Sequence, residues 1–389
     1  MRRFIKSVWI AALVLSVWAC NTATNEQEFD TLLSDVSARF APDKRVAVLN
    51  FKIEKTKQGT VVLKGETNLK EAHAFLLDTL GKAQIQVVDS IRILPGEQLE
   101  EQVWGLITLS VIPMRKTPDY AAEMVSQTLM GTPIKLLDKE GGWYRIQTPD
   151  QYIGWVYGSG IVSLSQSELN NWKASNRYIF TQISGSVLEA PKAGAAPVSD
   201  LVLGCIFEGG QQTNGFIEVK FPDGREGFVP SADCALFSEW EAITPEVENI
   251  IATAKKLLGR PYLWGGTSTK GVDCSGFTKT AYYSQGVMLA RDASQQALYG
   301  EQLDISQFQF QPGDLLFFGR SKERITHVGL FIGNDRFIHS SGRVKINSFQ
   351  AEDEDFDEGL KKRLVAACRV LNSLNTEQII PIKDHPWYN

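Results

Sequence analysis

The stretch that decides the fold of the last third of the chain is Gly-Val-Asp-Cys-Ser-Gly-Phe at residues 271–277, preceded by Gly-Arg-Pro-Tyr-Leu-Trp-Gly-Gly at residues 259–266. The segment that follows, 277–284, has few helix breakers and apolar residues at helical spacing, which predicts a helix. Cys274 is then expected at or just before the N-terminus of that helix. There the helix dipole and the free backbone amides favour thiolate over thiol, and the thiolate is the attacking species. The amide of Cys274 is also expected to donate to the oxyanion that forms on attack.

A thiolate that attacks an amide needs a proton donor for the leaving amine, and histidine titrates in the useful range. The chain has four histidines, and two of them lie in apolar stretches that are typical of buried strands. His327 lies in Ile-Thr-His-Val-Gly-Leu-Phe-Ile at 325–332, and His339 lies in Arg-Phe-Ile-His-Ser at 336–340. On neighbouring strands the two imidazoles can lie in line, so that the first pairs with the thiolate and the second orients the first.

Five short motifs occur in order within residues 245–371, and together they resemble the NlpC family of cell-wall peptidases. The motifs are Arg-Pro-Tyr-Leu-Trp-Gly-Gly at 260–266, Asp-Cys-Ser-Gly-Phe at 273–277, Gln-Pro-Gly-Asp-Leu at 311–315, His-Val-Gly-Leu at 327–330 and Ile-His-Ser at 338–340. The resemblance implies a papain-like α+β domain, placed at residues 241–372, and activity as a cysteine peptidase.

The resemblance also assigns roles to single positions. It implies that Cys274 is the nucleophile, His327 the general base and acid, and His339 the residue that orients His327. Further positions that it implies are Tyr262, which lines the site and assists the oxyanion, and the substrate-side residues Trp264, Asp273, Ser275, Ser294 and Gln295. No cofactor is implied, and because the histidines lack the tight spacing of zinc ligands, no metal site is predicted.

An internal repeat precedes this domain. Residues 142–156 align without a gap to residues 215–229, and each copy predicts a hairpin with a Pro-Asp turn that closes on Gly-aromatic-Val. The repeat resembles bacterial SH3-like barrels, which we place at 106–168 and 174–240. The aromatic residues of the repeat either bind the cell wall and shape the cleft or fill two small cores, and the core interpretation is favoured; they are Trp143, Trp155, Phe216 and Phe228.

The layout of two SH3-like domains before the catalytic domain resembles the γ-D-glutamyl-L-diamino acid endopeptidases. The resemblance implies cleavage of the peptidoglycan stem between D-glutamate and the diamino acid, in some members only when the N-terminal L-alanine is free. Holding a free amine requires acidic or acceptor groups. Asp273 is one candidate, and Glu123 and Tyr157 of the first barrel are others, although ordinary surface and barrel positions are the favoured interpretation of the latter two.

The start of the chain is interpreted as an export signal at residues 1–20, with a basic beginning, a short apolar run and a small residue before Cys20. This resembles a lipoprotein processing site, so lipidation of Cys20 and anchoring to a membrane are expected. Plain signal cleavage and an uncleaved anchor are the alternatives. Residues 21–28 are polar and unpatterned, as a tether is.

Residues 21–105 are interpreted as this tether followed by a small α/β domain, with strands at 45–53, 61–63 and 85–94 and a helix at 69–80. The polar stretch 165–175 is interpreted as a linker, and a helix is expected from Thr244 as N-cap to Gly259. Cys205 and Cys234 either form a disulfide or stay free. The acidic stretch 352–358 is interpreted as a solvated loop, Cys368 as a core strand position, and the aromatic residues of the tail at 373–389 are expected to dock on the body.

The predicted fold class is therefore multidomain α+β: a small N-terminal α/β unit, two SH3-like β-barrels and a papain-like α+β domain. The net charge of −5 gives no sign of the basic surface that nucleic-acid binding needs, so no nucleic-acid partner is predicted. We expect an exported monomer of the cell envelope that acts on peptidoglycan stem peptides. The alternatives are a non-catalytic wall-binding scaffold, and an amide hydrolase or acyltransferase of the same fold that acts on a different bond.

Overall fold

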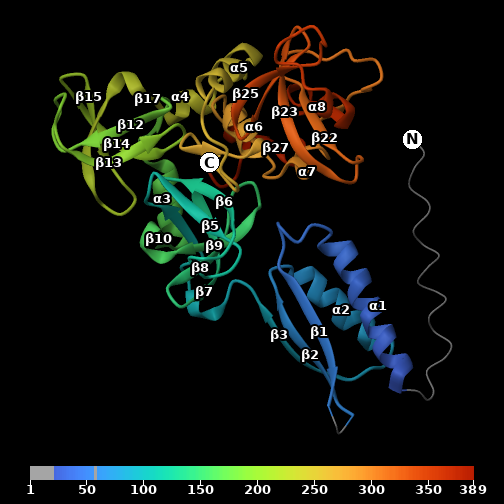
Figure 1. Cartoon of the computed structure of the whole chain (residues 1–389). Helices are drawn as coiled ribbons and strands as arrows, with labels where there is room; N and C mark the ends of the chain where they lie inside the picture. Colours follow the sequence, from blue (N-terminus) through green and yellow to red (C-terminus); the bar gives the residue numbers. More distant parts are fainter. Residues whose placement is uncertain (1–21, 57–58) are drawn as a thin grey trace. The chain divides into compact units, whose positions relative to one another are not determined.

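The computed structural model describes residues 22–56 and 59–389, and Figure 1 shows their course. The expected signal at 1–20 and its Cys20 lie outside the described residues. The chain divides into two compact units, Met1–Glu97 and Gln98–Asn389. Within the described part of the chain, no helix is long and apolar enough to cross a membrane.

The first unit has two helices and a three-stranded sheet, in agreement with the predicted α/β fold. In the order β1-β2-β3, β1 is antiparallel to β2, and β2 is parallel to β3 because a helix connects them. The elements are α1 (Thr22–Phe40), β1 (Leu49–Lys55), β2 (Val61–Thr67), α2 (Lys70–Lys82) and β3 (Val87–Ile93).

The interpretation of residues 21–28 as a tether is wrong, because α1 begins at Thr22. The reason lies further along the helix, where Phe29 and Val36 are buried against the sheet and α2. They are seven residues apart, two helical turns, and so point to the same side. Burial of this apolar side stabilises the helix despite its polar start.

The second unit begins with a seven-stranded sheet in the order β10-β4-β7-β8-β9-β5-β6, here called the first β domain. Its β4 starts at Trp104, so this domain begins before the predicted boundary at 106. Among the described residues the pairings do not join the end strands β10 and β6 into a closed barrel. Its strands are β4 (Trp104–Ile107), β5 (Val111–Arg115), β6 (Met124–Leu129), β7 (Pro133–Glu140), β8 (Trp143–Gln147), β9 (Ile153–Tyr157) and β10 (Ile161–Leu164).

The expected linker at 165–175 is instead a helix, α3 (Gln166–Ala174). The Ser165 hydroxyl accepts from the Glu168 amide while the Glu168 carboxylate accepts from the Ser165 amide, which is a complete capping box. Leu169 and Trp172 of this short helix are buried, so the segment packs as a structural element rather than a spacer.

A second seven-stranded sheet follows, in the order β13-β12-β16-β15-β14-β11-β17, here called the second β domain. Cys205 and Cys234 both belong to it and both are free thiols, so the disulfide left open by the sequence is not formed. Its strands are β11 (Arg177–Phe180), β12 (Ser184–Leu188), β13 (Pro197–Val202), β14 (Ile206–Thr213), β15 (Phe216–Lys220), β16 (Glu226–Pro230) and β17 (Cys234–Leu236), and α4 (Phe237–Glu241) comes next.

The aromatic residues of the repeat fill the two β domains only in part. Trp143 and Trp155 are buried, but Phe216 and Phe228 are half-buried. The core of the first β domain is built mainly from aliphatic residues such as Ile134 and its neighbours. The interpretation of all four side chains as core residues therefore holds for the tryptophans and is wrong for the phenylalanines.

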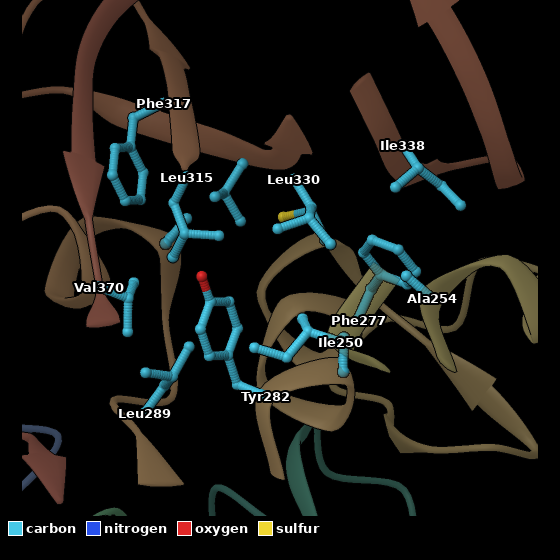
Figure 2. Packing of buried hydrophobic residues seen from close by; sticks show 14 of the residues in the cluster. Ile250, Ala254, Phe277, Tyr282, Leu289, Leu315, Phe317, Leu330, Ile338 and Val370 are labelled. Carbon is cyan, nitrogen blue, oxygen red and sulfur yellow. The ribbon is translucent and has the colours of Figure 1, made fainter. Parts of the chain in front are cut away.

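The C-terminal domain packs helices on both faces of a six-stranded antiparallel sheet in the order β21-β26-β22-β23-β24-β25. Figure 2 shows this core, in which Phe277 and Tyr282 of α6 meet Leu315, Leu330 and Ile338 of the sheet. Its helices are α5 (Val247–Lys256), α6 (Cys274–Tyr283), α7 (Ala293–Gln296) and α8 (Glu358–Arg363). Its strands are β18 (Thr267–Ser268), β19 (Gly271–Val272), β20 (Val287–Leu289), β21 (Glu301–Gln302), β22 (Leu315–Gly319), β23 (Ile325–Gly333), β24 (Arg336–Ser341), β25 (Arg343–Ser348), β26 (Leu364–Arg369) and β27 (Ile379–Pro381).

The first helix of this domain and its C-terminal tail differ in how well the sequence predicts them. The helix α5 starts at Val247 with Glu246 as its N-cap, so the predicted cap at Thr244 is wrong by two residues, because Glu246 is still extended. The tail docks as expected, since β27 pairs with β20 and Trp387 packs edge-on against Trp104 of the first β domain, with ring centroids 5.2 Å apart. Cys368 is fully buried in β26, which confirms its core position.

Candidate active site

Cys274 is the first residue of α6, so its predicted place at a helix N-terminus is confirmed. Asp273 is the N-cap, and its carboxylate accepts from the Gly276 amide at 2.7 Å. A side chain at Gly276 would collide with the carbonyl oxygen of Gly266, because a Cβ there would lie 2.0 Å from it. The glycine therefore allows the loop of the first motif to pass directly over the start of α6.

The thiol of Cys274 is 8% exposed. Burial, together with the nearby Asp273 carboxylate, raises its pKa to about 11 against the opposing effect of the backbone amides of Val328 and Ser275. The backbone amides favour the thiolate, as expected for a helix N-terminus, and burial of the side chain opposes them.

The two histidines lie on adjacent strands, as predicted. His327 is on β23 and His339 is on β24, and Nε2 of His327 lies 2.7 Å from Nδ1 of His339. Burial and the neighbouring His339 lower the pKa of His327 to about 3, and burial lowers the pKa of His339 to about 4. Burial therefore favours the neutral form of both imidazoles, and each neutral ring keeps one nitrogen lone pair.

Strand β23 connects the Cys274 thiol with the catalytic histidine, because it carries both His327 and a backbone amide that reaches the sulfur. The amide of Val328, the residue after His327, interacts with the sulfur. In the described part of the chain no hydrogen bond joins Sγ to the His327 ring, a common state of catalytic pairs before substrate binds. The arrangement suits transfer of the thiol proton to His327 as the sulfur attacks, rather than a preformed ion pair.

Tyr262 borders the same site. Its backbone is fixed by an amide hydrogen bond to the Gly342 carbonyl at 2.9 Å and by a bridge to Val272. Burial, with the charges of Cys274 and Asp273 nearby, raises the pKa of its phenol to about 12. The hydroxyl thus keeps its proton and can donate to an oxyanion.

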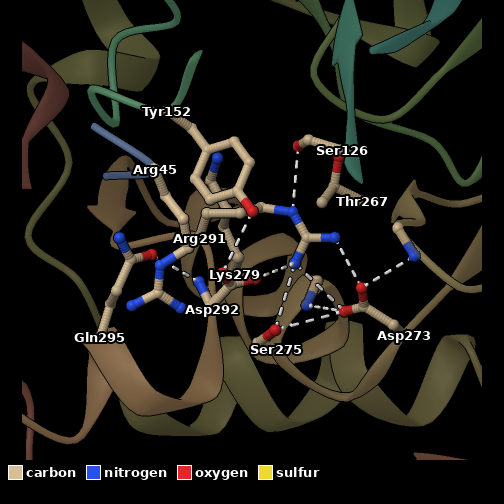
Figure 3. Close-up of polar contacts among 12 residues, drawn as sticks. Arg45, Ser126, Tyr152, Thr267, Asp273, Ser275, Lys279, Arg291, Asp292 and Gln295 are labelled. Carbon is tan, nitrogen blue, oxygen red and sulfur yellow. Dashed lines mark hydrogen bonds and ion pairs between the residues drawn. The ribbon is translucent and has the colours of Figure 1, made fainter. Parts of the chain in front are cut away.

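Asp273 is held by a buried guanidinium, as Figure 3 shows. The side chain of Arg291 is 1% exposed and donates from Nη2 to Asp273 at 2.5 Å and from Nη1 to Ser275 at 3.1 Å. Its Nε donates to the hydroxyl of Ser126, on β6 of the first β domain, at 3.0 Å. One arginine therefore connects the residues on both sides of the nucleophile to the neighbouring domain.

The first β domain also contacts the catalytic loop directly. The Thr267 amide and hydroxyl both bond to Gln127 of β6 at 2.9 Å. The indole N–H of Trp264, a residue 62% exposed, donates to the Glu123 carboxylate at 3.0 Å. The first β domain thus forms one wall beside Cys274.

Comparison with known proteins identifies two of these regions. Residues 259–366 match the model of the NlpC/P60 family. The C-terminal domain is an NlpC/P60 domain. Residues 114–161 match the bacterial dipeptidyl-peptidase SH3 domain, so the first β domain is of this SH3 type.

Curated relatives share this combination over most of their length. The chain is 27% identical to dipeptidyl-peptidase 6 of Lysinibacillus sphaericus over 64% of this chain and 93% of that protein. It is 27% identical to the γ-D-glutamyl-L-lysine dipeptidyl-peptidase of Bacillus cereus over 57% of this chain and 68% of that protein. A solved NlpC/P60 family protein from Bacillus cereus superposes with a TM-score of 0.60, over 68% of this chain and 99% of that one, at 23% identity, which shows a common fold.

The remaining predicted site residues lie at different places around the NlpC/P60 domain. Asp273 and Ser275 are buried beside Cys274, with Arg291 as their partner. Gln295 is buried in α7, where its side chain accepts from the Asp292 amide, and Ser294 beside it is half-buried. Their contacts with substrate stay predictions.

Tyr157 lies on the first β domain in an aromatic group. Its ring packs 5.4 Å from Trp143 and 5.2 Å from Tyr120, measured between centroids, and it is 38% exposed. The part of Tyr157 in amine recognition stays a prediction.

Two residues of the site are not predicted by the sequence. Arg291 lies outside the motifs of the resemblance, and its neighbours in the chain give no sign that its partner is Asp273. Oδ1 of Asn347, on β25, accepts from Nε2 of His339 at 2.8 Å. Strand alternation is the one available signal. Lys345 lies opposite His339 in the strand pair, and Asn347, two residues further on, lies on the same face of the sheet.

Acid is expected to destabilise the second unit through the histidine pair. Both pKa values are depressed on folding, so between about pH 6.5 and pH 4 the unfolded imidazoles bind protons that the native ones do not, and the free energy of unfolding falls as pH falls through this window. At about 1.4 kcal/mol for each pKa unit, the loss amounts to several kcal/mol. Urea unfolding at pH 7 and pH 4.5 measures it.

The control for this experiment is the double variant His327→Gln, His339→Gln, which has no imidazole at either position. Its midpoint should change less between the two pH values than that of the wild type. An equal change in both proteins would mean that the histidine pair does not carry the acid sensitivity.

Proposed function

We propose that this chain hydrolyses the γ-D-glutamyl-L-diamino acid amide of peptidoglycan stem peptides. The observation that carries the proposal is the placement of the Cys274 thiol at the start of α6, beside the residue that follows His327, with His339 hydrogen-bonded behind it. The names of the relatives, which are dipeptidyl-peptidases, support the choice of bond.

The proposed reaction has two stages. Cys274 Sγ attacks the amide carbon and its proton passes to His327, while the carbonyl oxygen becomes an oxyanion held by the Tyr262 hydroxyl and the Cys274 amide. The C–N bond then breaks, His327 returns the proton to the amine of the diamino acid, and a thioester remains. Water attacks the thioester with His327 as base, which releases the L-Ala-γ-D-Glu carboxylate and restores the thiol.

The first β domain supports a preference for stems with a free N-terminal L-alanine. It walls one side of the site, and the exposed Glu123 carboxylate is oriented by the Trp264 indole. An ammonium group of the substrate would compete with the exposed Lys116, 3.3 Å away, for the exposed Glu123 carboxylate, whereas Asp273 is held in the interior by Arg291 and two backbone amides. We assign Glu123 the first role in amine recognition, and Asp273 and Tyr157 stay secondary candidates.

The proposal places the protein outside the cytoplasm, where its substrate is. The NlpC/P60 domain and its relatives support action in the cell envelope. Lipidation at Cys20, a monomeric state and attachment to a membrane are further parts of the proposal that rest on the sequence.

Mass spectrometry of stem peptides after incubation tests the reaction. L-Ala-γ-D-Glu-diamino acid should yield L-Ala-γ-D-Glu, and an N-acetylated stem should react about 100-fold more slowly, as expected when a charged hydrogen-bonded contact of about 3 kcal/mol is lost. In the Glu123→Gln variant the free and blocked stems should react at more similar rates.

The products distinguish the alternatives. Cleavage at another amide would assign the chain to the amide hydrolase or acyltransferase alternative. Binding to cell wall without any product would favour a scaffold. Equal rates for free and blocked stems would remove the free-amine requirement and keep the peptidase.

A further inference from the structure

Behind the two histidines lies a third polar side chain that belongs to no motif. Asn347 is on β25, is 8% exposed, and its Oδ1 lies 2.8 Å from Nε2 of His339. On its other side, Nδ2 donates to the backbone carbonyl of Asp355 at 2.7 Å. A chain of three hydrogen bonds therefore runs from a peptide carbonyl to His327.

The first member of this chain, the Asp355 backbone carbonyl, can only accept a hydrogen bond. A peptide carbonyl accepts and never donates, so the Asn347 atom that faces Asp355 must be the NH2 group. The atom that faces His339 is then the amide oxygen, which only accepts. Nε2 of His339 must therefore carry a proton.

The same logic continues to the catalytic base. A neutral imidazole with a proton on Nε2 has its lone pair on Nδ1, so Nδ1 of His339 accepts from Nε2 of His327. The proton of His327 is thereby held on Nε2, and its Nδ1 keeps the lone pair that must receive the proton of the thiol. In the opposite tautomer of His327, the lone pair on its Nε2 would face the lone pair on Nδ1 of His339, and no hydrogen bond could form.

The Asp355 carbonyl is itself fixed in place. It also accepts from the Ser348 amide at 2.9 Å, and the next residue, Phe356, forms a bridge with Ser348. The Asp355 carboxylate is bound by Arg336 at 2.6 Å. The acidic stretch 352–358 is thus an anchored part of the domain, and the interpretation of it as only a solvated loop is wrong at this point.

We infer that Asn347 is a positioning residue that sets the tautomer of His327, through His339, from the backbone carbonyl of Asp355. This inference rests on the proposed function for its consequence in catalysis, since it names how the base of that same site is prepared. The tautomer itself is a property of the free protein and can be measured without substrate.

Nitrogen NMR of protein labelled with 15N-histidine tests the inference directly, with signals assigned by the His327→Gln and His339→Gln variants. At neutral pH, His327 and His339 should both carry their proton on Nε2. In Asn347→Leu, the His339 signal should change toward a mixture of the two tautomers, because the acceptor that selects Nε2–H is gone. A wild-type His327 with its proton on Nδ1 overturns the inference, whether or not Asn347→Leu folds.

Kinetics with the stem peptide supply the second readout. Asn347→Leu should lower kcat by about 10- to 100-fold, the range found when a partner that orients a metal-binding histidine is removed, with KM little changed. The matched control is Asn372→Leu, the same substitution at a residue that bonds only to the Glu301 side chain in the described structure. An unchanged kcat in a folded Asn347→Leu variant would overturn the inference.

The two readouts separate this inference from the proposed function. Correct tautomers in a protein that cleaves no stem peptide would refute the reaction and leave the hydrogen-bond chain standing. Cleavage of the expected bond by a protein whose His327 carries its proton on Nδ1 would support the reaction and refute the hydrogen-bond chain.

Discussion

Replacing Cys274 with alanine is expected to abolish cleavage of stem peptides, with a fall in kcat of at least about 10⁴-fold, as for other enzymes that lose their nucleophile. The physical reason is that no other thiol of the described chain lies at the site, since Cys205 and Cys234 belong to the second β domain and Cys368 is buried in β26. Mass spectrometry of product formed over time measures the effect. The fold should be retained, because the substitution removes one sulfur from the first turn of α6.

Cys368→Ala is the matched control. Cys368 is fully buried in β26, and burial raises the pKa of its thiol to about 12, so it is inert. This variant should keep its activity while its stability falls modestly because of the small cavity. A fully active Cys274→Ala variant would contradict the cysteine mechanism, and stable wall binding by the inactive protein would not, because binding and cleavage are separate properties.

The local part of the site could be predicted from the sequence. Cys274 follows an N-cap aspartate and precedes a breaker-free segment, and each histidine is within an apolar strand pattern, so short-range periodicity places all three on the correct elements. Register then brings the histidines together, because β23 and β24 are consecutive antiparallel strands joined by a tight turn.

The supporting residues could not be predicted in this way. Arg291 meets Asp273 and Ser126, which are 18 and 165 residues away in sequence, and Asn347 depends on a carbonyl in an irregular loop. Such contacts arise from tertiary packing within and between domains, and no local pattern encodes them. The capping box at Ser165 and Glu168 is different, since its spacing is readable in the sequence, but the polar segment around it favours a linker over a helix.

The second large effect is expected at Arg291. Arg291→Met should lower the free energy of unfolding by about 3–5 kcal/mol, the usual cost of removing one partner of a buried ion pair. The variant leaves the Asp273 carboxylate 7% exposed and without its cation, and it also breaks the bond to Ser126. Urea unfolding, compared by midpoint at an unchanged slope, measures the loss.

A double variant separates charge from shape. Asp273→Asn still caps α6, because asparagine is as good an N-cap as aspartate, and it carries no charge to be left unpaired. Adding it to Arg291→Met should therefore recover part of the lost stability, so that the two changes are not additive. Lys362→Met is the control, since Lys362 pairs with Glu358 on the exposed surface and such a pair contributes at most about 1 kcal/mol. If Arg291→Met were no less stable than this control, the guanidinium would not be the group that holds Asp273 in place. The start of α6 at Cys274 would then be held against the first β domain by other contacts.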